Sequence, residues 1–278
     1  MEISEILRDC NFDFKKKFGQ NFLTDTNLLN AICDDASINK ADEVLEIGVG
    51  AGTLTKVLSN HAKKVVGYEI DKSLFDVLSL TLKDCENVEV NFKDFLLAEC
   101  DEINQKFDSK FKVVANLPYY ITTNIIFKLI EEDFNVESLT LMVQKEVAER
   151  LTANKNTKEY GTITAELDAV GDVKIMRIVP RTMFLPQPNV DSAIINIKIN
   201  KNKYDIFDIE LFRKVVRASF SMRRKTLSNC LKTNFGFSIE QIDELFETLN
   251  FDKNIRGEAL STIDFVNLSN EIFRLYKK

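Results

Sequence analysis

The stretch Glu43–Gly52 reads EVLEIGVGAG, an apolar run that ends in three glycines spaced as Gly-x-Gly-x-Gly. A helical pattern follows and begins near Thr53. A strand, a glycine-rich turn and a helix in this order form the first half of a βαβ unit, and glycines allow the backbone of such a turn to approach a ligand closely. The spacing differs from the Gly-x-Gly-x-x-Gly of dinucleotide-binding proteins, which disfavours a nucleotide-dependent oxidoreductase.

Short β-branched runs alternate with helical patterns from residue 43 to about residue 143, and two further strand-like runs follow. The expected strands are Glu43–Ile47, Lys64–Ile70, Val88–Asn91, Phe111–Ala115, Ser138–Val143, 173–179 and 193–199. This alternation predicts an α/β fold, with a mostly parallel sheet covered by helices on both faces. Right-handed crossovers bring the C-terminal ends of the parallel strands to one edge of the sheet, where ligands bind.

The pattern becomes helical from about residue 205 onward, beyond the polar stretch Asn200–Lys203. We therefore predict a domain over residues 1–202 that contains the sheet, and a small all-helical domain over residues 203–278. Residues 211–239 carry basic side chains and no acid, and a second basic cluster lies at Lys15–Lys17. Such clusters can hold a phosphate backbone, although charge alone is equally compatible with solvated charged faces.

The composition of the 278-residue chain excludes several classes of protein. The 37 Lys and Arg against 43 Asp and Glu give a net charge of −6, and 45% of residues are apolar, as in an ordinary globular protein. No apolar run is long enough for a membrane helix, and the start does not resemble a signal peptide. Five scattered cysteines and a single histidine indicate free thiols in a reducing compartment and no metal site, so we expect a cytoplasmic protein.

Acidic residues lie at or after the ends of two further expected strands, at the edge where the glycine turn is expected. Glu69 lies in the last residues of the second strand, where a carboxylate can accept hydrogen bonds from ribose hydroxyls. Asp94 comes after the third strand. Each acid alone is typical of a helix N-cap, but together with the glycine turn they favour a nucleoside ligand.

The segment Asn116–Tyr120 (NLPYY) directly follows the fourth strand and fits chemistry at an adenine amine. That amine is a poor nucleophile because its lone pair is delocalised into the ring. Acceptors on its N–H groups, from the Asn116 side chain and the Leu117 carbonyl, would localise the lone pair on nitrogen. Pro118 keeps the turn rigid, and the ring of Tyr119 offers a stacking face worth roughly 1–3 kcal/mol to an unstacked base.

With these motifs in their order along the chain, the sequence resembles the ribosomal RNA small-subunit adenine dimethyltransferases. The segments that carry the resemblance are Phe18–Leu23, Glu46–Gly52, Glu69, Asp94, Asn116–Tyr120, Gln144–Arg150, Phe184–Ala193, Arg223–Leu227 and Arg256–Ser261. The resemblance implies a Rossmann-like class I methyltransferase with a seven-stranded sheet, followed by a small helical domain. One departure is Asn124, where the family usually has proline at the start of a helix.

The resemblance also implies roles for individual residues. The cofactor would be S-adenosylmethionine, and the residues that match its site in the family are Asn21, Leu23, Gly48, Gly50, Glu69, Asp94 and Asn116. Phe184 resembles the aromatic residue that stacks on the flipped base opposite Tyr119, and a core phenylalanine is the alternative interpretation. Charge favours rRNA contacts in the helical domain by Arg217, Arg223, Arg224 and Lys225.

The function that we predict is dimethylation of the N6 amine of two adjacent adenines in the 3′-terminal hairpin of 16S rRNA. The partner would be the small ribosomal subunit, and we expect a monomer that does not bind membranes. One alternative is a 23S rRNA adenine methyltransferase of the macrolide-resistance type, which shares the fold and a related motif. Another is a ribosome assembly factor that acts mainly by binding.

Overall fold

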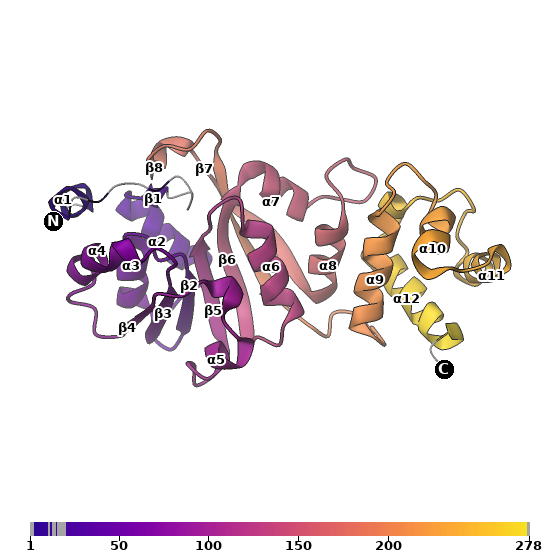
Figure 1. Cartoon of the computed structure of the whole chain (residues 1–278), viewed down its shortest axis with the longest axis horizontal. Coiled ribbons are helices and arrows are strands. Elements are labelled where there is room, and N and C mark those ends of the chain that lie inside the picture. The colour runs from indigo at the N-terminus through magenta and orange to yellow at the C-terminus, as the bar shows by residue number, and fades with distance from the viewer. Residues whose placement is uncertain (1–2, 11, 13–14, 16–20, 277–278) are drawn as a thin grey trace. The chain divides into compact units, whose positions relative to one another are not determined.

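The structure is a computed structural model that describes residues 3–10, 12, 15 and 21–276. Lys16, Lys17 and the Phe18–Gln20 part of the first family segment lie outside the described residues. Figure 1 labels the elements along the chain. None of the helices within the described residues is long and apolar enough to cross a membrane.

Within the described residues, the main sheet has seven strands in the order β4-β3-β2-β5-β6-β9-β7. Their bounds are β2 (Glu43–Ile47), β3 (Lys64–Tyr68), β4 (Val88–Asn91), β5 (Phe111–Asn116), β6 (Val136–Gln144), β7 (Gly171–Val179) and β9 (Ser192–Ile199). The pairs β2–β3, β3–β4, β2–β5 and β5–β6 are parallel, whereas β9 runs antiparallel to β6. The predicted mostly parallel, seven-stranded α/β sheet is therefore confirmed.

The strand ends agree with the sequence-based bounds to within two residues. β3 stops at Tyr68 and not at Ile70, because Glu69 and Asp71 form the turn that leads into a 3-10 helix. β6 begins at Val136, two residues earlier than expected, and a register shift between Phe111 and Lys112 accommodates its extra length. These shifts leave the C-terminal ends of β2, β3, β4 and β5 on one edge of the sheet, as the parallel pairing requires.

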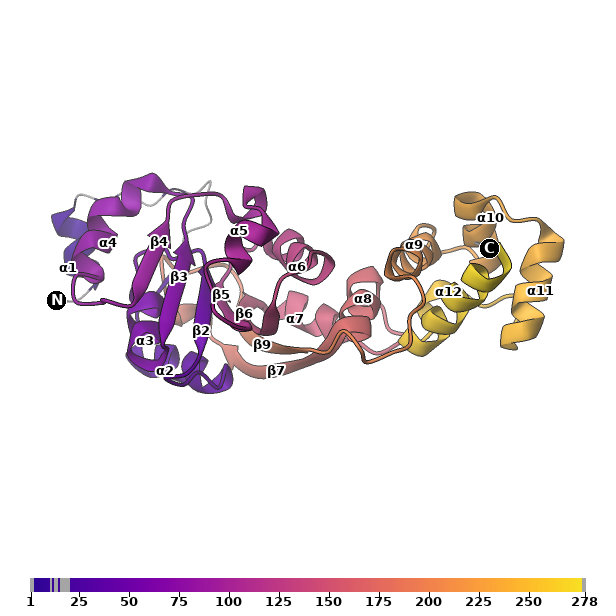
Figure 2. The same ribbon diagram turned by 90° about the horizontal axis from the view of Figure 1, so that it is seen from below.

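Helices cover both faces of the sheet. Figure 2 shows α2 and α3 on one face and α5 and α6 on the other. The helices of this part of the chain are α1 (Ile3–Asp9), α2 (Thr26–Asp35), α3 (Thr53–His61), α4 (Phe75–Thr81), α5 (Cys100–Asn104) and α6 (Thr122–Glu131). Short 3-10 helices follow β3 and β4, namely η2 (Lys72–Leu74) and η3 (Phe95–Leu97).

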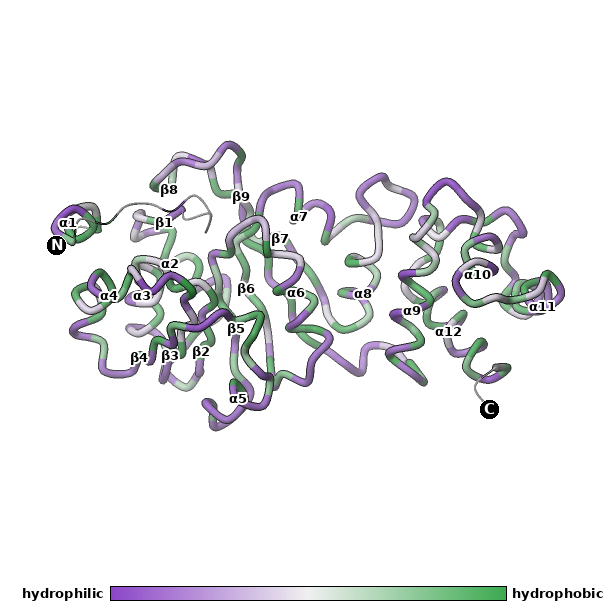
Figure 3. Tube along the Cα trace, in the orientation of Figure 1, coloured by the Kyte–Doolittle hydropathy of each residue, from purple (hydrophilic) through white to green (hydrophobic). Residues whose placement is uncertain are grey.

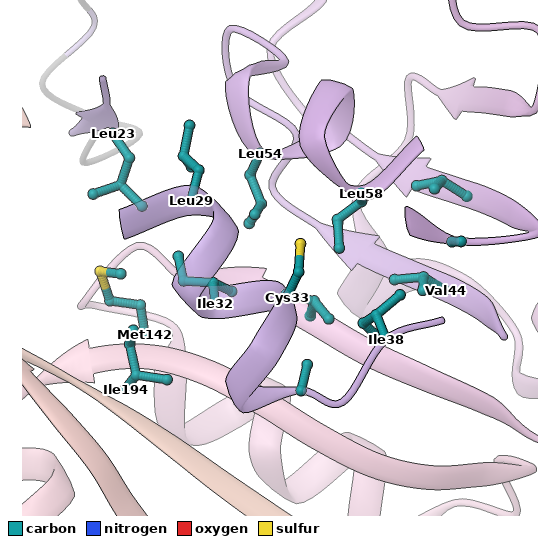
Figure 4. Close-up of a cluster of buried hydrophobic side chains, with 14 of the residues drawn as sticks. Leu23, Leu29, Ile32, Cys33, Ile38, Val44, Leu54, Leu58, Met142 and Ile194 are labelled. Carbon is teal, nitrogen blue, oxygen red and sulfur yellow. The ribbon is translucent and has the colours of Figure 1, made fainter. Parts of the chain in front are cut away.

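The core between the sheet and α2 and α3 is built from side chains that alternate along the strands. Val44, Val65 and Val114 come from three neighbouring strands and pack against Leu29 and Leu58 of the two helices. Figure 4 shows how the side chains of this cluster point toward one another. Figure 3 shows the apolar colour concentrated along β5 and β6, which lie in the middle of the sheet and are buried on both faces.

Two short strands outside the main sheet were not predicted. β1 (Phe22–Leu23) and β8 (Phe184–Leu185) pair antiparallel, and Leu23 lies opposite Phe184. Two residues are too few to give an alternating pattern, so a pairing between segments about 160 residues apart leaves no local signal in the sequence.

The chain forms two compact units that are not contiguous in sequence. One unit comprises residues 1–148 and 174–199, and the other comprises residues 149–173 and 200–278. A single boundary after residue 202 therefore differs from the observed division. The physical reason is α8 (Thr162–Val170), whose apolar face packs on α9 and α12 and places residues 149–173 with the C-terminal helices.

The second unit is helical apart from the part of β7 that it contains. Its elements are the end of α7 (Lys145–Leu151), α8, α9 (Ile209–Phe220), α10 (Leu227–Phe235), α11 (Ile239–Leu249), η5 (Gly257–Ala259) and α12 (Thr262–Tyr276). Side-chain N-caps fix the starts of α9, α10 and α11, and glycine or asparagine in the left-handed conformation ends α10 and α11. All five cysteines of the chain are free thiols.

Gly257 allows η5 to pack directly on the backbone of α9, and we expect its replacement to destabilise this unit. A Cβ at residue 257 would lie 2.4 Å from the carbonyl oxygen of Ser219, which cannot move without distorting α9. Gly257→Ala should lower the free energy of unfolding by about 1–3 kcal/mol in urea titrations. Gly161→Ala is the matched control, since a Cβ there meets nothing within 4 Å. Equal stability of the two variants would contradict this packing.

Candidate active site

A cavity opens at the C-terminal edge of the main sheet, beside the strand ends that the sequence singles out. β2 lies between β3 and β5, so the chain leaves β2 in one direction and later returns on its other side. Such a switch in direction creates the crevice in which α/β proteins bind ligands. The predicted site residues that line the cavity are Asn21, Leu23, Gly48, Gly50, Glu69, Asp94, Asn116, Leu117, Pro118 and Tyr119.

The glycine turn after β2 forms the floor of this cavity. Gly48 and Gly50 have φ values of +80° and +57°, in the left-handed region that favours glycine. A Cβ on Gly50 would also lie 3.0 Å from the ring of Phe22. The turn therefore requires glycine at position 50 both for its conformation and for space. It leaves backbone N–H groups near the cavity, and that of Gly50 donates to Glu69 Oε2 at 2.7 Å.

Glu69 is buried next to the glycine turn and is held at both carboxylate oxygens. Besides the bond from Gly50, its Oε1 accepts from the backbone N–H of Asp71 at 2.8 Å. Burial raises the pKa of Glu69, and these backbone N–H groups act in the opposite direction by stabilising the charged form. The carboxylate is thus fixed in orientation at the cavity wall, where each oxygen retains a lone pair for a ligand.

Asp94 combines a capping role with a place in the cavity wall. Its Oδ1 accepts from the backbone N–H of Leu96 at 2.9 Å, which starts the 3-10 helix after β4. The same side chain lines the cavity. The N-cap and the ligand-facing position are therefore not exclusive alternatives for this residue.

Asn116 ends β5 and reaches across the cavity to the N-terminal segment. Its Nδ2 donates to the backbone carbonyl of Asn21 at 2.9 Å. A carbonyl can only accept, so this bond requires the amide nitrogen to point toward Asn21 and leaves Oδ1 on the other side. The arrangement holds the side-chain oxygen of Asn116 as an acceptor in a defined direction.

The backbone carbonyls of Leu117 and Pro118, in the turn after Asn116, differ in their hydrogen bonding. The carbonyl of Pro118 accepts from the backbone N–H of Ile121 and the hydroxyl of Thr122, both at 3.2 Å, so it is used inside the turn. No described residue donates a hydrogen bond to the carbonyl of Leu117. Asn116 and Leu117 both line the cavity, and each keeps an oxygen acceptor that the hydrogen bonds among the described residues leave unused.

The two tyrosines of the motif have different environments. Tyr119 lines the cavity, and its hydroxyl is 2.8 Å from the Oγ of Ser192 at the start of β9. Burial raises the pKa of this phenol. Tyr120 also lines the cavity, but the residue is 61% exposed.

Phe184 is not among the residues that line the cavity. It is 5% exposed and packs in the cluster of buried side chains between the sheet and α2 and α3, next to Met183. Leu23, its partner across the short β1–β8 pair, belongs to the same cluster but also reaches the cavity. Stacking of Phe184 on a base would need it to leave this packing, and that role stays a prediction.

The basic residues chosen for RNA binding lie in the helical unit and fall into two groups. Arg217 pairs with the buried carboxylate of Glu166 at 3.0 Å. Arg223 pairs with Glu258 at 3.2 Å and donates to the carbonyls of Thr157 and Lys158. Both arginines therefore have a structural role that charge counting did not predict.

Arg224 and Lys225 follow Arg223 in the loop before α10. Both side chains are exposed, and no described residue forms an ion pair with either of them. A cation without a protein partner is available for a phosphate, in contrast to Arg217 and Arg223. Within the basic segment, these two residues are the better candidates for RNA contacts.

Two buried polar groups at the cavity were not singled out individually by the sequence analysis. Glu46 on β2 is 1% exposed, and its Oε2 has no hydrogen-bond partner among the described residues; the same holds for the hydroxyl of Tyr68 on β3. Burial raises the pKa of Glu46 to about 8, and the charge of Glu69 adds to this effect. The available signal was an acid in the middle of the strand EVLEI, because buried acids concentrate at functional sites.

No three His, Cys, Asp or Glu side chains within the described ranges gather closely enough to hold a metal ion.

The fold and the site together define a class of enzyme. Within the described residues, a mostly parallel seven-stranded sheet in which β9 runs antiparallel to β6, with a glycine turn after β2 and an acid after β3, has the features of a Rossmann-like class I methyltransferase. The ribosomal RNA adenine dimethylase family model matches residues 11–272 of the chain. The chain belongs to this family.

Relatives and solved structures agree with this assignment. The chain is 43% identical to ribosomal RNA small subunit methyltransferase A of Clostridium acetobutylicum, over 97% of the chain and 98% of the relative. It is 46% identical to the protein of the same name from Bacillus cereus, over 96% and 94%. A dimethyladenosine transferase from Plasmodium falciparum has a TM-score of 0.78 at 28% identity, over 91% and 98%. The 23S rRNA methyltransferase ErmE has a TM-score of 0.68 at 25% identity, over 90% and 98%.

Proposed function

We propose that this protein uses S-adenosylmethionine to dimethylate the N6 amine of two adjacent adenines in the 3′-terminal hairpin of 16S rRNA. The observation that carries the proposal is the acceptor pair in the cavity, Asn116 Oδ1 and the Leu117 carbonyl, next to the glycine turn. The relatives at 43–46% identity, which are named as small-subunit rRNA methyltransferases over nearly their full length, support this choice of RNA.

The residues of the cavity fit S-adenosylmethionine, which supplies an electrophilic methyl group on a positively charged sulfur. The buried Glu46 has an oxygen without a partner among the described residues, and the carboxylates of Glu69 and Asp94 share its cavity. Such a set of acceptors suits a ligand with hydroxyl and ammonium donors and a cationic centre. Glu69 would bind the ribose hydroxyls, Asp94 the adenine, and Asn21, Leu23, Gly48 and Gly50 would complete the contact surface.

Catalysis by the protein rests on orientation of the adenine amine. Asn116 Oδ1 and the Leu117 carbonyl each accept one N–H of the target amine, which favours a pyramidal nitrogen and localises its lone pair. The bond from Asn116 Nδ2 to Asn21 holds the acceptor in place before the base arrives, so no reorganisation is needed during reaction. No general base is required, because the amine loses its proton to solvent after the transfer.

The base must leave the helical stack to reach this site, since the amine is inaccessible within an RNA helix. Tyr119 provides an aromatic face at the cavity, and its hydroxyl is anchored by Ser192. Stacking on such a ring contributes roughly 1–3 kcal/mol per base. We assign Tyr119 as the platform, with Phe184 on the opposite side of the base if it turns out of the core.

Contacts to the rRNA backbone are assigned to the exposed cations Arg224 and Lys225 of the helical unit. We expect Arg224→Ala and Lys225→Ala each to weaken binding to small subunits by about three- to tenfold. Each should also reduce the slope of log affinity against log salt concentration by roughly 0.7–0.9. This is the change expected when one fewer counterion is released on binding. Fluorescence titrations with undermethylated subunits at several salt concentrations measure both quantities.

Two further variants separate RNA contacts from structural effects. Arg274→Ala removes an exposed arginine of α12 that pairs with Glu271, and it should leave both quantities unchanged. Arg223→Ala should instead lower thermal stability, because Arg223 holds Glu258 and two loop carbonyls. Unchanged salt slopes for Arg224→Ala and Lys225→Ala would place the RNA contacts elsewhere.

The proposal as a whole is tested by incubation with labelled S-adenosylmethionine and mapping of the modified nucleotides. Small subunits from a strain without this modification should acquire two dimethyladenosines in the 3′-terminal hairpin. Methylation of 23S rRNA would favour the alternative for which the similarity to ErmE is the supporting observation. An Asn116→Ala variant that restores subunit assembly would shift the role toward binding. A monomeric state and a cytoplasmic location stay predictions, which light scattering and cell fractionation test.

A further inference from the structure

Lys15 is tied to the cofactor side of the cavity by a chain of short contacts. Its Nζ lies 2.7 Å from Asp71 Oδ1 and 2.6 Å from the hydroxyl of Ser73. The backbone N–H of Asp71 in turn donates to Glu69 Oε1, whose other oxygen accepts from Gly50. The chain thus runs from the N-terminal segment, across 56 residues of sequence, to the carboxylate at the cavity wall.

Asp71 needs a nearby cation because its side chain is only 3% exposed. A carboxylate removed from water is costly unless it is paired or hydrogen-bonded. Lys15 is 37% exposed, so its ammonium keeps contact with solvent while it neutralises the buried acid. The hydroxyl and the backbone N–H of Ser73 also donate to Asp71 Oδ1.

The charge of Asp71 matters for Glu69 because the two carboxylates are close. Burial is the main cause that raises the pKa of Glu69, and the charge of Asp71 raises it further. The charged and titratable groups around Glu69 come from several elements and are Glu46, Asp71, Lys15, Lys93, Asp94 and Tyr120. Lys93 pairs with Glu102, so its charge is already shared with another acid.

We propose that Lys15 is a positioning residue for cofactor binding: its ammonium offsets the charge of Asp71 and thereby keeps Glu69 ionised and correctly oriented. The inference rests on the proposed role of Glu69 as the ribose-binding carboxylate. The inference also changes the role predicted for Lys15 from charge alone. Lys15 would support the cofactor site through Asp71 and would not contact an RNA phosphate. A protonated Glu69 has one acceptor fewer, so a ribose diol binds it more weakly.

Calorimetric titration with S-adenosylmethionine at several values between about pH 6 and about pH 9 tests the proposal. Lys15→Met should weaken binding by about tenfold near neutral pH. The deficit should shrink as the pH rises, because Glu69 with a raised pKa regains its charge there. Lys15→Arg should keep nearly full affinity. Lys72→Met is the matched control, because it removes an exposed lysine that directly follows Asp71 in the chain. This variant should bind S-adenosylmethionine like the wild type.

A double variant separates charge compensation from simple anchoring of the N-terminal segment. In Lys15→Met with Asp71→Asn there is no buried charge left to neutralise, so affinity should return to within about threefold of wild type. If Lys15 only anchors the segment, the double variant stays as weak as Lys15→Met and the deficit is the same at every pH. That result, or equal behaviour of Lys15→Met and Lys72→Met, would overturn the proposal.

Glu69→Ala, measured in parallel, distinguishes failure of this inference from failure of its basis. Loss of affinity in Glu69→Ala with none in Lys15→Met overturns only the role of Lys15. Wild-type affinity in Glu69→Ala removes the ribose-binding role of Glu69 and the inference with it. Methylation of small subunits by the wild-type protein is recorded separately, so that the activity as a whole is judged independently of both.

Discussion

Asn116→Ala should lower the rate of adenine methylation at saturating cofactor by about 10²–10³-fold, the usual effect of removing one preorganised polar group from an active site. The variant loses the acceptor Oδ1 that is aimed by the bond to Asn21 at 2.9 Å. Affinity for S-adenosylmethionine should fall much less, since Glu69, Asp94 and the glycine turn remain. Single-turnover methylation and calorimetric titration measure the two effects separately.

The control for this variant is an asparagine with a similar bond and no contact with the cavity. Asn30 on α2 donates its Nδ2 to the carbonyl of Thr26 at 2.8 Å, and Asn30→Ala should leave both quantities unchanged. Equal losses of rate and cofactor affinity in Asn116→Ala would mean that Asn116 serves the cofactor alone. The acceptor role toward the adenine amine would then be wrong.

Glu46→Gln should make the protein more stable in alkaline solution, although it alters a residue of the cavity. Glu46 has a pKa of about 8 in the folded protein against an ordinary value of 4.5, so the folded state binds the proton more tightly. Stability is therefore lost as the pH rises from about 4.5 through about 8. Glutamine carries no charge to bury, and the free energy of unfolding at about pH 9 should rise by roughly 3–5 kcal/mol.

Urea titrations without cofactor, at pH values on both sides of this range, measure the effect. The two proteins should be similar near pH 5 and diverge as the pH rises. Glu43→Gln is the matched control on the same strand, because Glu43 is equally buried but pairs with Lys63 at 3.1 Å. Glu43→Gln should lower the free energy of unfolding, because it removes one partner of this ion pair. Parallel pH profiles for Glu46→Gln and the wild type would show that Glu46 does not carry a buried charge.

Much of the fold and of the cofactor side of the cavity could be predicted because the signals are local. Each strand is an apolar run of its own, and the residue that follows it is forced to the ligand-binding edge by the parallel topology. Gly48, Glu69, Asp94 and Asn116 were found in this way, and all four line the cavity. The antiparallel direction of β9 does not affect this edge, because β9 lies on the far side of β6 from β2, β3 and β5.

The parts that could not be predicted depend on pairs that are distant in sequence. Counting charges cannot tell that Arg223 is engaged by Glu258 whereas Arg224 is exposed. Nor does composition reveal that Phe184 packs in the core, because an aromatic residue after a polar loop suits a core and a stacking site equally. The link from Lys15 to Asp71 similarly has no sequence pattern.

The interleaved path of the chain has a consequence for anyone who dissects this protein. An expression fragment that ends near residue 202 would keep α8 but lose α9 and α12, against which it packs. α8, most of whose residues are buried in the whole chain, would lose these two helices, and Glu166 would be left without Arg217. Such a fragment should be prone to aggregation, so a soluble catalytic piece would have to replace residues 149–173 by a short linker as well.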